Sequence, residues 1–573
     1  MSQGSHRLPL MRSTKRGVVY LFGTCAMVLV SVVSTPKPLA AQEAIAPATA
    51  CESLVELDLR DLEGAPSRVD GAEVVEIEGK GPHCVVNGYS ASDVRFEVRM
   101  PVEAWTGRFL MLGCGGYCGG INADPSSNQS RALSDCEPVT RGEVVTASSD
   151  LGHRRSPQWF PDMLWALGNP GAIVDFAYEG MNKSTIVSKA LIEAYYGQPA
   201  AANYFVGCSD GGRQGLAMAQ RYPAAYDGIV VGAPVIDKAV NDSMYHAWGI
   251  HVNTGADAQA ILTADKIPAL HQLVMDTCAD EGGLIQDERL CNFEPAALQC
   301  EGDDTAECLT AAQVKVVEQV YRGPNSGETL FSAGKMPKGS ELAWVGTFIP
   351  EAADGPMDTS LGDAAWSFEY PRYGSSFDAP TGLDFEMIEY DQATYDRLSE
   401  LSQLNDPNNP DLAPFRHAGG KMILWVGSAD PGVPLRSTLN YVTAVKEQMG
   451  EVDDFMSFYM LPGVNHCGAG PNEATLDMLS PMIDWVEGGT APDEIVYSIL
   501  LDDGTTATRP VHPYPSMVTY EGSGDVNQAA AWQRGELPMG LEESLDWAGL
   551  KNYRPGNTTW CDWEGASLIC ETR

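Results

Sequence analysis

Short apolar runs and longer helix-like runs alternate along the chain from about residue 95. The strand-like runs are RFEVRM, RFLMLG, GEVVTASSD and NYFVG, and the helix-like runs are STIVSKALIEAYYG and RQGLAMAQRYP. Strands that alternate with helices are typical of a mainly parallel sheet with helices on both faces. The pattern therefore predicts the α/β class.

The alternation stops near Pro234 and returns only after residue 415. Residues 237–415 are rich in glycine, proline and acidic residues, and strand and helix character returns with KMILWVGSAD, FMSFYMLPGVNH and ATLDMLSPMIDWVEGG. We expect one α/β domain, made of residues 42–236 and 416–573 with a C-terminal tail, and a lid inserted between them over residues 237–415. The alternative, three consecutive domains, would leave the first and last with incomplete sheets.

The N-terminal pattern is that of a secretory signal. Arg12, Lys15 and Arg16 precede the apolar run GVVYLFGTCAMVLVSVV, and the small residues of PLAAQ follow it. This order predicts a signal peptide over residues 1–41, cleaved after Ala41, and a secreted or periplasmic protein. An uncleaved anchor is the alternative, since the run approaches spanning length. No later run is long enough, so we expect no membrane association after cleavage.

Charge narrows the choice of partner. The chain has 37 Lys and Arg against 77 Asp and Glu, a net charge of −40, which argues against nucleic acid or an anionic membrane as partner. With 573 residues and an apolar fraction of 44%, the chain can build a large core.

The cysteines indicate a disulfide framework. Of the 14 cysteines, loss of Cys25 with the signal leaves 13 in an oxidising compartment. No CxxC occurs, so zinc-binding spacing is missing. Among Cys114, Cys118 and Cys136 one thiol is left over. Pairs of sequence neighbours are expected at Cys51–Cys84, Cys278–Cys291, Cys300–Cys308 and Cys561–Cys570.

A GxSxG sequence at residues 207–211 indicates a serine nucleophile. Its glycines allow the sharp bend that lifts a serine hydroxyl above a sheet, and here an apolar strand enters the motif and a helix leaves it. An ordinary serine in a glycine turn is the alternative. A serine hydroxyl needs an imidazole to take its proton and a carboxylate to orient that imidazole.

The base predicted for Ser209 is His466. In α/β hydrolases the order along the chain is serine, acid, histidine. His466 ends an apolar run and begins the loop NHCGAGPN, whereas His271 and His417 precede the expected acid and His512 lies between prolines.

Asp430 is the predicted acid because it follows the buried-strand pattern MILWVG. Asp453 and Asp454 precede a strand instead. Cys208 precedes the predicted nucleophile and Cys467 follows the predicted base, so the two sulfurs could bridge if Ser209 and His466 are in contact. Such a bridge would close a ring worth about 4 to 5 kcal/mol in the loop-entropy model.

Six segments together resemble the tannase and feruloyl esterase family, which includes mono(2-hydroxyethyl) terephthalate hydrolase. The resemblance spans roughly residues 95–530. It implies an α/β-hydrolase fold, a large lid between the nucleophile and acid segments, and hydrolysis of aromatic carboxylic esters. The segments are GCSDGGRQG, PGVNHCGAGP, GCGGYCGG, VVTASSDLGH, DFAYEGMNKSTIVSKALIEAYYG and RPVHPYPSMVTYEGSGD.

An attacked ester also needs two backbone donors for its oxyanion. The amide of Asp210 is the first expected donor. The second is expected from Gly115 or Gly116, in the glycine-rich loop after RFLML. This chemistry requires no redox or nucleotide cofactor.

The chain departs from the family at the calcium loop that many members carry between two lid cysteines. Here the interval is CADEGGLIQDERLC, and its candidate ligands are Asp280, Glu281 and Asp287. Calcium takes several oxygen ligands. The sequence therefore indicates no firm metal site and leaves a structural calcium doubtful.

The sequence predicts a serine esterase for a small-molecule aromatic ester, of feruloyl, galloyl or terephthaloyl monoester type. A broad carboxylesterase or acyltransferase is the alternative among enzymes, and a non-catalytic binding protein on a hydrolase frame is the alternative outside them. The inserted region offers an aromatic cluster for a planar acyl group and an arginine for a carboxylate. These candidates are Trp344, Phe348, Trp366, Phe368, Tyr370 and Arg372.

Overall fold

The structure is a computed structural model that describes residues 43–125, 132–156, 161–352, 355–358, 360–375, 385–538, 546–565 and 567–573. The chain divides into two units, Met1–Glu43 and Ala44–Arg573, and every described helix and strand belongs to the second. The predicted signal peptide over residues 1–41 lies outside the described residues. Within the described ranges, no helix is long and apolar enough to cross a membrane.

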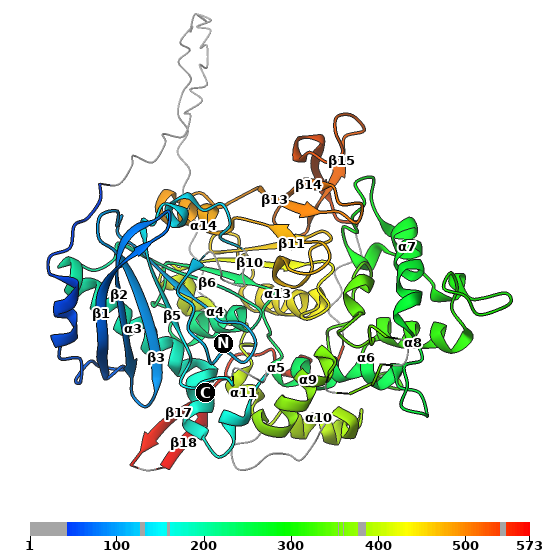
Figure 1. Cartoon of the computed structure of the whole chain (residues 1–573), viewed down its shortest axis with the longest axis horizontal. Helices are drawn as coiled ribbons and strands as arrows, with labels where there is room; N and C mark the ends of the chain where they lie inside the picture. Colours follow the sequence, from blue (N-terminus) through cyan, green and yellow to red (C-terminus); the bar gives the residue numbers. More distant parts are fainter. Residues whose placement is uncertain are drawn as a thin grey trace, which may run out of the picture. The chain divides into compact units, whose positions relative to one another are not determined.

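A mixed sheet forms the centre of the second unit (Figure 1). In the described part of the chain it has nine strands, in the order β1-β2-β3-β5-β4-β6-β7-β10-β11. Its strands are β1 (Ser67–Ile77), β2 (Gly81–Ser90), β3 (Val94–Pro101), β4 (Arg108–Leu112), β5 (Val144–Ser149), β6 (Ala202–Cys208), β7 (Gly228–Gly232), β10 (Lys421–Gly427) and β11 (Met456–Leu461).

The two halves of this sheet have different strand directions. β1, β2, β3 and β5 pair antiparallel, whereas β5, β4, β6, β7, β10 and β11 pair parallel. The parallel strands are buried almost throughout, as expected for strands covered on both faces. All the predicted strands are present, but RFEVRM forms β3, which pairs antiparallel with its neighbours, and the antiparallel hairpin β1–β2 was not predicted.

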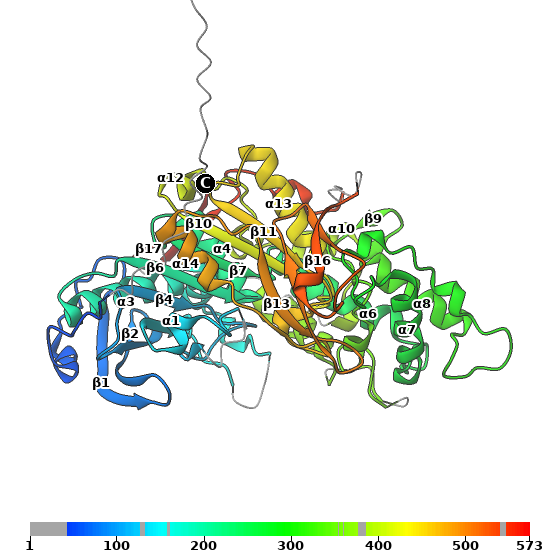
Figure 2. The ribbon, with the colours of Figure 1, turned by 90° about the horizontal axis from the view of Figure 1, so that it is seen from above.

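Helices pack on the sheet from several points along the chain (Figure 2). α3 contacts β3 and β5, α4 contacts β6 and β7, α13 contacts β10, and α14 contacts β7 and β10. The described α-helices are α1 (Glu137–Thr140), α2 (Pro170–Val174), α3 (Gly180–Tyr196), α4 (Asp210–Arg221), α5 (Lys238–Val240), α6 (His246–Asn253), α7 (Ile267–Cys278), α8 (Ala311–Arg322), α9 (Gly362–Glu369), α10 (Gln392–Leu398), α11 (Ser402–Asn405), α12 (Ala413–His417), α13 (Leu435–Met449) and α14 (Leu479–Gly488).

The segment between β7 and β10 contains helices α5 to α12 joined by long loops, coloured green to yellow-green in Figure 1. Within it α6 packs against α8 and α9, and α7 packs against the 3-10 helix η9 (Glu341–Trp344). Its short hairpin joins β8 (Asn325–Ser326) to β9 (Thr329–Leu330). Two predicted disulfides, Cys278–Cys291 and Cys300–Cys308, are confirmed in this segment.

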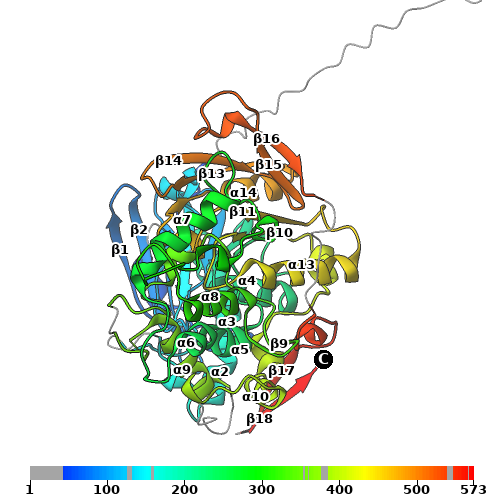
Figure 3. The same cartoon turned by 90° about the vertical axis from the view of Figure 1, so that its right-hand side faces the viewer.

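Small antiparallel sheets follow the central sheet in the sequence. They consist of β12 (Ala474–Thr475), β13 (Ile495–Leu500) and β14 (Thr506–Val511), of β15 (Ser516–Tyr520) with β16 (Trp532–Glu536), and of β17 (Thr559–Glu564) with β18 (Ser567–Thr572). The β15–β16 and β17–β18 hairpins lie at opposite edges of the unit (Figure 3).

Three further disulfides and one free thiol are found among the described cysteines outside this segment, in addition to the Cys208–Cys467 bridge. Cys51–Cys84 and Cys561–Cys570 are confirmed as predicted. Cys114 pairs with Cys118, so the leftover thiol is Cys136. Burial raises the pKa of the Cys136 thiol to about 12, which keeps it protonated and unreactive.

Candidate active site

Ser209 lies in the sharp turn between β6 and α4. Its backbone has φ 64° and ψ −125°, a positive φ that is uncommon for a residue other than glycine. The turn is fixed on both sides, because the Ser209 amide donates to Gly232 O at 3.0 Å and the Arg213 amide donates to Ser209 O at 3.0 Å. Such strain persists only where surrounding bonds impose it, and it clusters at functional sites.

The glycines around Ser209 are required by close backbone contacts. A Cβ added at Gly207 would lie 2.4 Å from Gly211 O, and one added at Gly212 would lie 2.4 Å from Gly232 O. Neither contact is tolerable for a side-chain carbon. The sequence GCSDGG therefore allows α4 to start directly against β6 and β7.

Asp430 and His466 come together from the ends of two neighbouring strands. Asp430 follows β10 and is fully buried, and its Oδ1 accepts hydrogen bonds from the amides of Gly432 and Val433, both at 2.8 Å. His466 follows β11, and its Nδ1 lies 2.8 Å from Asp430 Oδ2. With Nδ1–H donating to this carboxylate, the neutral imidazole keeps Nε2 as a proton acceptor.

Ser209 and His466 line one cavity of about 90 Å³. A cavity of this size suits one small group rather than a drug-sized ligand. Its described lining combines apolar, aromatic and charged side chains with two glycines. It consists of Gly116, Ser209, Asp210, Val235, Lys238, Asn241, Asp242, His246, Trp366, Gly432, Val433 and His466.

The Cys208–Cys467 disulfide is present in the structure. It joins the residue before Ser209 to the residue after His466, which are 259 positions apart in the sequence. The bond therefore ties the β6–α4 turn to the loop after β11.

Backbone amides are available at the cavity in two places. Asp210 is the first residue of α4, where helix amides lack partners within the helix. Gly116 lines the cavity, whereas Gly115 is outside its lining. Their loop is held by the Cys114–Cys118 disulfide and by Gln214, whose side chain bonds both the amide and the carbonyl of Cys114 at 3.2 and 3.0 Å.

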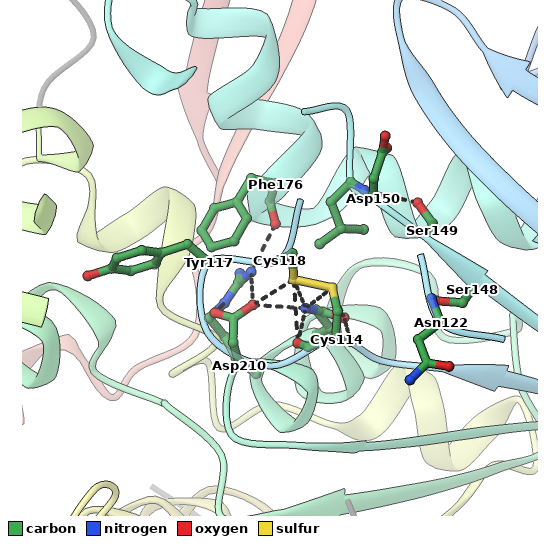
Figure 4. Close-up of a disulfide and its surroundings, with 12 residues drawn as sticks. Cys114, Tyr117, Cys118, Asn122, Ser148, Ser149, Asp150, Phe176 and Asp210 are labelled. Atoms are coloured by element: carbon green, nitrogen blue, oxygen red, sulfur yellow. Dashed lines mark hydrogen bonds and ion pairs between the residues drawn. A yellow bond between two sulfur atoms is a disulfide. The ribbon is translucent and has the colours of Figure 1, made fainter. Parts of the chain in front are cut away.

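The side chain of Asp210 is a buried anion beside this loop (Figure 4). Its Oδ1 lies 2.6 Å from Arg213 Nε and 3.0 Å from Lys238 Nζ. Burial alone would raise the pKa of Asp210, but the charges of Arg213 and Lys238 outweigh burial and hold it below its usual value. Asp210 therefore stays ionised, and its ion pairs fix the start of α4.

A second group of polar side chains reaches the cavity from the chain after β7. Lys238 Nζ lies 2.7 Å from Asp242 Oδ2, and Asn241 Nδ2 lies 3.1 Å from Asp242 Oδ1. His246 Nδ1 lies 2.6 Å from Asp363 Oδ1. Burial opposes protonation of His246, yet the charge of Asp363 outweighs it and raises the pKa of His246.

This polar group was missed in the sequence. Lys238, Asp242 and His246 are spaced by four residues, the spacing that places side chains on one face of a helix. Here the helix is irregular, because the π-helix η5 (Asn241–Tyr245) separates α5 from α6. The spacing alone was a weak signal, since nothing in the sequence places this face beside Ser209.

Of the predicted acyl-pocket residues, Trp366 lies in the cavity lining. Its ring packs edge-on against Tyr117, with centroids 4.8 Å apart. Trp344, Phe348 and Tyr370 are fully buried in the core and are outside the lining. Phe368 and Arg372 are also outside it, with the Arg372 guanidinium 4.1 Å from the Phe368 ring centroid.

A residue of the C-terminal region, Tyr553, contacts the segment that carries this polar group. Tyr553 Oη donates to Asp237 Oδ2 at 2.5 Å, directly beside Lys238 in the sequence. Burial raises the pKa of Asp237 to about 7, and the Tyr553 hydroxyl partly offsets that rise.

The calcium candidates do not fit a calcium ion. Asp280 already accepts from the amides of Gly282 and Leu284 and from Gln286 Nε2. Asp287 pairs with Arg289 at 2.5 Å, and Glu281 is exposed. Across the described ranges, no group of three or more His, Cys, Asp or Glu side chains could hold a metal.

Comparison with known proteins covers most of the chain. A family model described as "Tannase and feruloyl esterase" matches residues 76–534. The chain is 30% identical over 538 residues to mono(2-hydroxyethyl) terephthalate hydrolase from Piscinibacter sakaiensis, covering 82% of this chain and 86% of that protein. It is 29% identical to a probable feruloyl esterase from Arthroderma benhamiae, covering 75% and 80%.

Solved structures share the fold. Feruloyl esterase B from Aspergillus oryzae aligns with a TM-score of 0.69 at 24% identity, covering 85% of this chain and 99% of that chain. Tannin acyl hydrolase from Aspergillus niger aligns with a TM-score of 0.64 at 20% identity, covering 85% and 94%. The likeness identifies the fold as an α/β hydrolase with a mixed central sheet.

Proposed function

The chain belongs to the tannase and feruloyl esterase family, and from that premise we propose that it is a serine esterase that hydrolyses aromatic carboxylic esters. One observation carries the proposal. Ser209 sits in a strained turn on the same cavity as His466, whose Nδ1 contacts Asp430. A serine, an imidazole and a buried carboxylate in these positions match the requirements of acyl transfer.

In the proposed reaction, His466 Nε2 takes the proton of the Ser209 hydroxyl as Oγ attacks the ester carbonyl. The resulting imidazolium is stabilised by the carboxylate of Asp430. Collapse of the tetrahedral intermediate releases the alcohol, which takes the proton from His466, and leaves an acyl-enzyme. Water then attacks the acyl group with His466 again as base, and His466 returns that proton to Ser209 Oγ as the bond to the acyl group breaks and the acid leaves.

The oxyanion of each intermediate needs fixed donors. We assign this role to the backbone amides of Asp210 and Gly116, because the first begins α4 and the second lines the cavity. The ion pairs of Asp210 and the Cys114–Cys118 disulfide support the assignment by restraining both loops.

Two further assignments belong to the same proposal. The segment between β7 and β10 would act as a lid, because it contributes Lys238, Asp242, His246 and Trp366 to the cavity. A secreted or periplasmic location is supported by six disulfides among the described residues.

The test is hydrolysis of methyl ferulate, methyl gallate and mono(2-hydroxyethyl) terephthalate by the oxidised protein, beside Ser209→Ala. Turnover of at least one ester, abolished by Ser209→Ala, is the expected result. A serine-directed phosphonate should label the wild-type protein at Ser209. If no ester is turned over and the phosphonate leaves the protein unlabelled, the chain is a binding protein on a hydrolase frame.

A further inference from the structure

Three loops meet at one buried hydroxyl near the proposed catalytic residues. The acid loop, residues 428–434, follows β10, and the base loop, residues 462–473, follows β11. The insert loop, residues 279–290, belongs to the segment between β7 and β10, where the Cys278–Cys291 disulfide closes it. The hydroxyl is that of Ser428, a residue that is 1% exposed.

This hydroxyl both accepts and donates a hydrogen bond. Ser428 Oγ accepts from the amide of Gly463 in the base loop at 2.9 Å and donates to Ile285 O in the insert loop at 3.0 Å. A serine hydroxyl has one proton, so its donation to Ile285 leaves the lone pairs for the Gly463 amide. Ser428 lies two residues before Asp430, and Gly463 lies three residues before His466. One side chain therefore links the loops that bring the acid and the base together.

The insert loop also packs directly on the base loop. Gly463 has a φ of 70°, and a Cβ added there would lie 2.5 Å from Leu284 Cδ2. Leu284 is buried, and together with Ile285 and with Ala429 of the acid loop it lines a cavity of only about 10 Å³. Because close-packed interiors transmit displacements, a shift of the insert loop would move the acid and base loops as well.

The base loop is held a second time, beyond His466. Asn472 Nδ2 donates to Asp502 Oδ1 at 2.9 Å, and Asp502 Oδ2 lies 2.9 Å from His271 Nε2. His271 belongs to α7, and its Nδ1 lies 2.7 Å from Glu341 Oε2. The segment between β7 and β10 is thus connected to the base loop on both sides of His466.

We infer that Ser428 is a positioning residue for the proposed reaction: with the insert loop, it fixes the Asp430 carboxylate against the His466 imidazole without contacting the ester. The inference rests on the proposed esterase function. Ser428 is outside the lining of the cavity beside Ser209, so its hydroxyl should affect the chemical step rather than substrate binding. A misplacement of about 1 Å caused away from the reacting atoms can lower a rate about 100-fold.

The test is steady-state hydrolysis by Ser428→Ala, with an ester that the wild-type protein turns over. This variant removes the partner that the Gly463 amide and the Ile285 carbonyl share. We expect kcat to fall about 10- to 100-fold while KM changes by less than about twofold. Labelling of Ser209 by a serine-directed phosphonate should slow by a similar factor, because it depends on the same base. A kcat within about twofold of wild type in folded Ser428→Ala would overturn the inference.

The matched control is Ser67→Ala, on the strand at the opposite edge of the sheet from β11. Ser67 is 5% exposed, and its Oγ donates to Ala65 O at 2.6 Å and lies 2.7 Å from Ser90 Oγ. Both variants should lower Tm, since each leaves buried polar groups without a partner. Only Ser428→Ala should lower kcat. Equal losses of kcat in the two variants would show that reduced stability, and not lost positioning, slows the reaction.

A second variant decides the matter if Ser428→Ala does not fold. Leu284→Ala keeps both hydrogen bonds of Ser428 but removes the side chain that packs on Gly463, so kcat should fall about fivefold at nearly constant KM. An unchanged kcat would overturn the inference. Failure of the esterase proposal looks different: the wild-type protein then turns over no ester and is not labelled by the phosphonate, and the role of Ser428 falls with it.

Discussion

Cys208 and Cys467 form a disulfide that joins the residue before Ser209 to the residue after His466. The proposed nucleophile and base are therefore held by a covalent link as well as by the packing of the sheet. In the loop-entropy model, a ring of 259 residues stabilises the fold by about 5 kcal/mol.

Replacing both Cys208 and Cys467 with serine should lower the free energy of unfolding by about 5 kcal/mol. Activity should fall as well, because the loops bearing Ser209 and His466 lose their link. Replacing Cys300 and Cys308, a bridge with a separation of only 8 residues, should cost about half as much and spare activity. Urea denaturation measures the free energy of unfolding, and ester hydrolysis measures the activity. Equal losses of stability and activity in the two double variants would contradict this account.

Asp430→Asn should lower kcat by about 10³- to 10⁴-fold with little change in stability. The amide oxygen can still accept from Gly432 and Val433, but the variant can no longer stabilise the His466 imidazolium. The control is Asp453→Asn, an exposed site that the sequence offered as an alternative acid. If kcat fell less in Asp430→Asn than in Asp453→Asn, Asp430 would not be the acid of the site.

Calcium should have no effect on stability. The loop between Cys278 and Cys291 is closed by protein contacts, including Arg509 Nη2, which donates to Gly282 O at 2.9 Å. A ligand that binds the native state raises Tm, so added calcium or a chelator should leave Tm unchanged. Arg509→Ala should lower Tm instead, because the guanidinium is buried against Trp532. A rise in Tm with calcium would show that the loop still binds the ion.

Because of His271, the free energy of unfolding should fall as the pH rises from 6.5 to about 9. Burial would lower its pKa, but hydrogen bonds to Asp502 and Glu341 raise the pKa of His271 from the usual 6.5 to about 9. The native state thus holds this proton more tightly than the unfolded state. The resulting stabilisation, up to about 3 kcal/mol, is complete below pH 6.5 and is lost as the pH rises toward 9.

The measurement is urea denaturation of the wild-type protein and His271→Gln across this pH range. Glutamine does not titrate, so the wild-type protein should lose more stability than the variant between pH 6.5 and 9. Parallel curves would mean that His271 is not charged in the native state.

The sequence was most informative where a structure depends on nearby residues. Strand, turn and helix around Ser209 are encoded within about 20 positions, and Asp430 and His466 could be located because each follows a buried strand. Four disulfides could be assigned because their partners are close in sequence.

Long-range packing accounts for what was missed. β1 is an edge strand, and residues 73–76 are all exposed, so it lacks the alternation that marks a half-buried strand. The aromatic cluster gave no indication that Trp366 faces the cavity while Trp344 and Tyr370 lie in the core. The place of Lys238 and Asp242 in the cavity lining likewise depends on packing that only the folded chain provides.

The bond between Tyr553 and Asp237 has a consequence for how the protein is made. It spans 316 positions and anchors the segment that supplies Lys238 and Asp242. During synthesis this support is missing until the ribosome has released residue 553, long after the turn at Ser209 has emerged. Nascent chains should therefore pass through a stage in which the central sheet is forming while the cavity wall is unsupported, so assembly of the site is a late event.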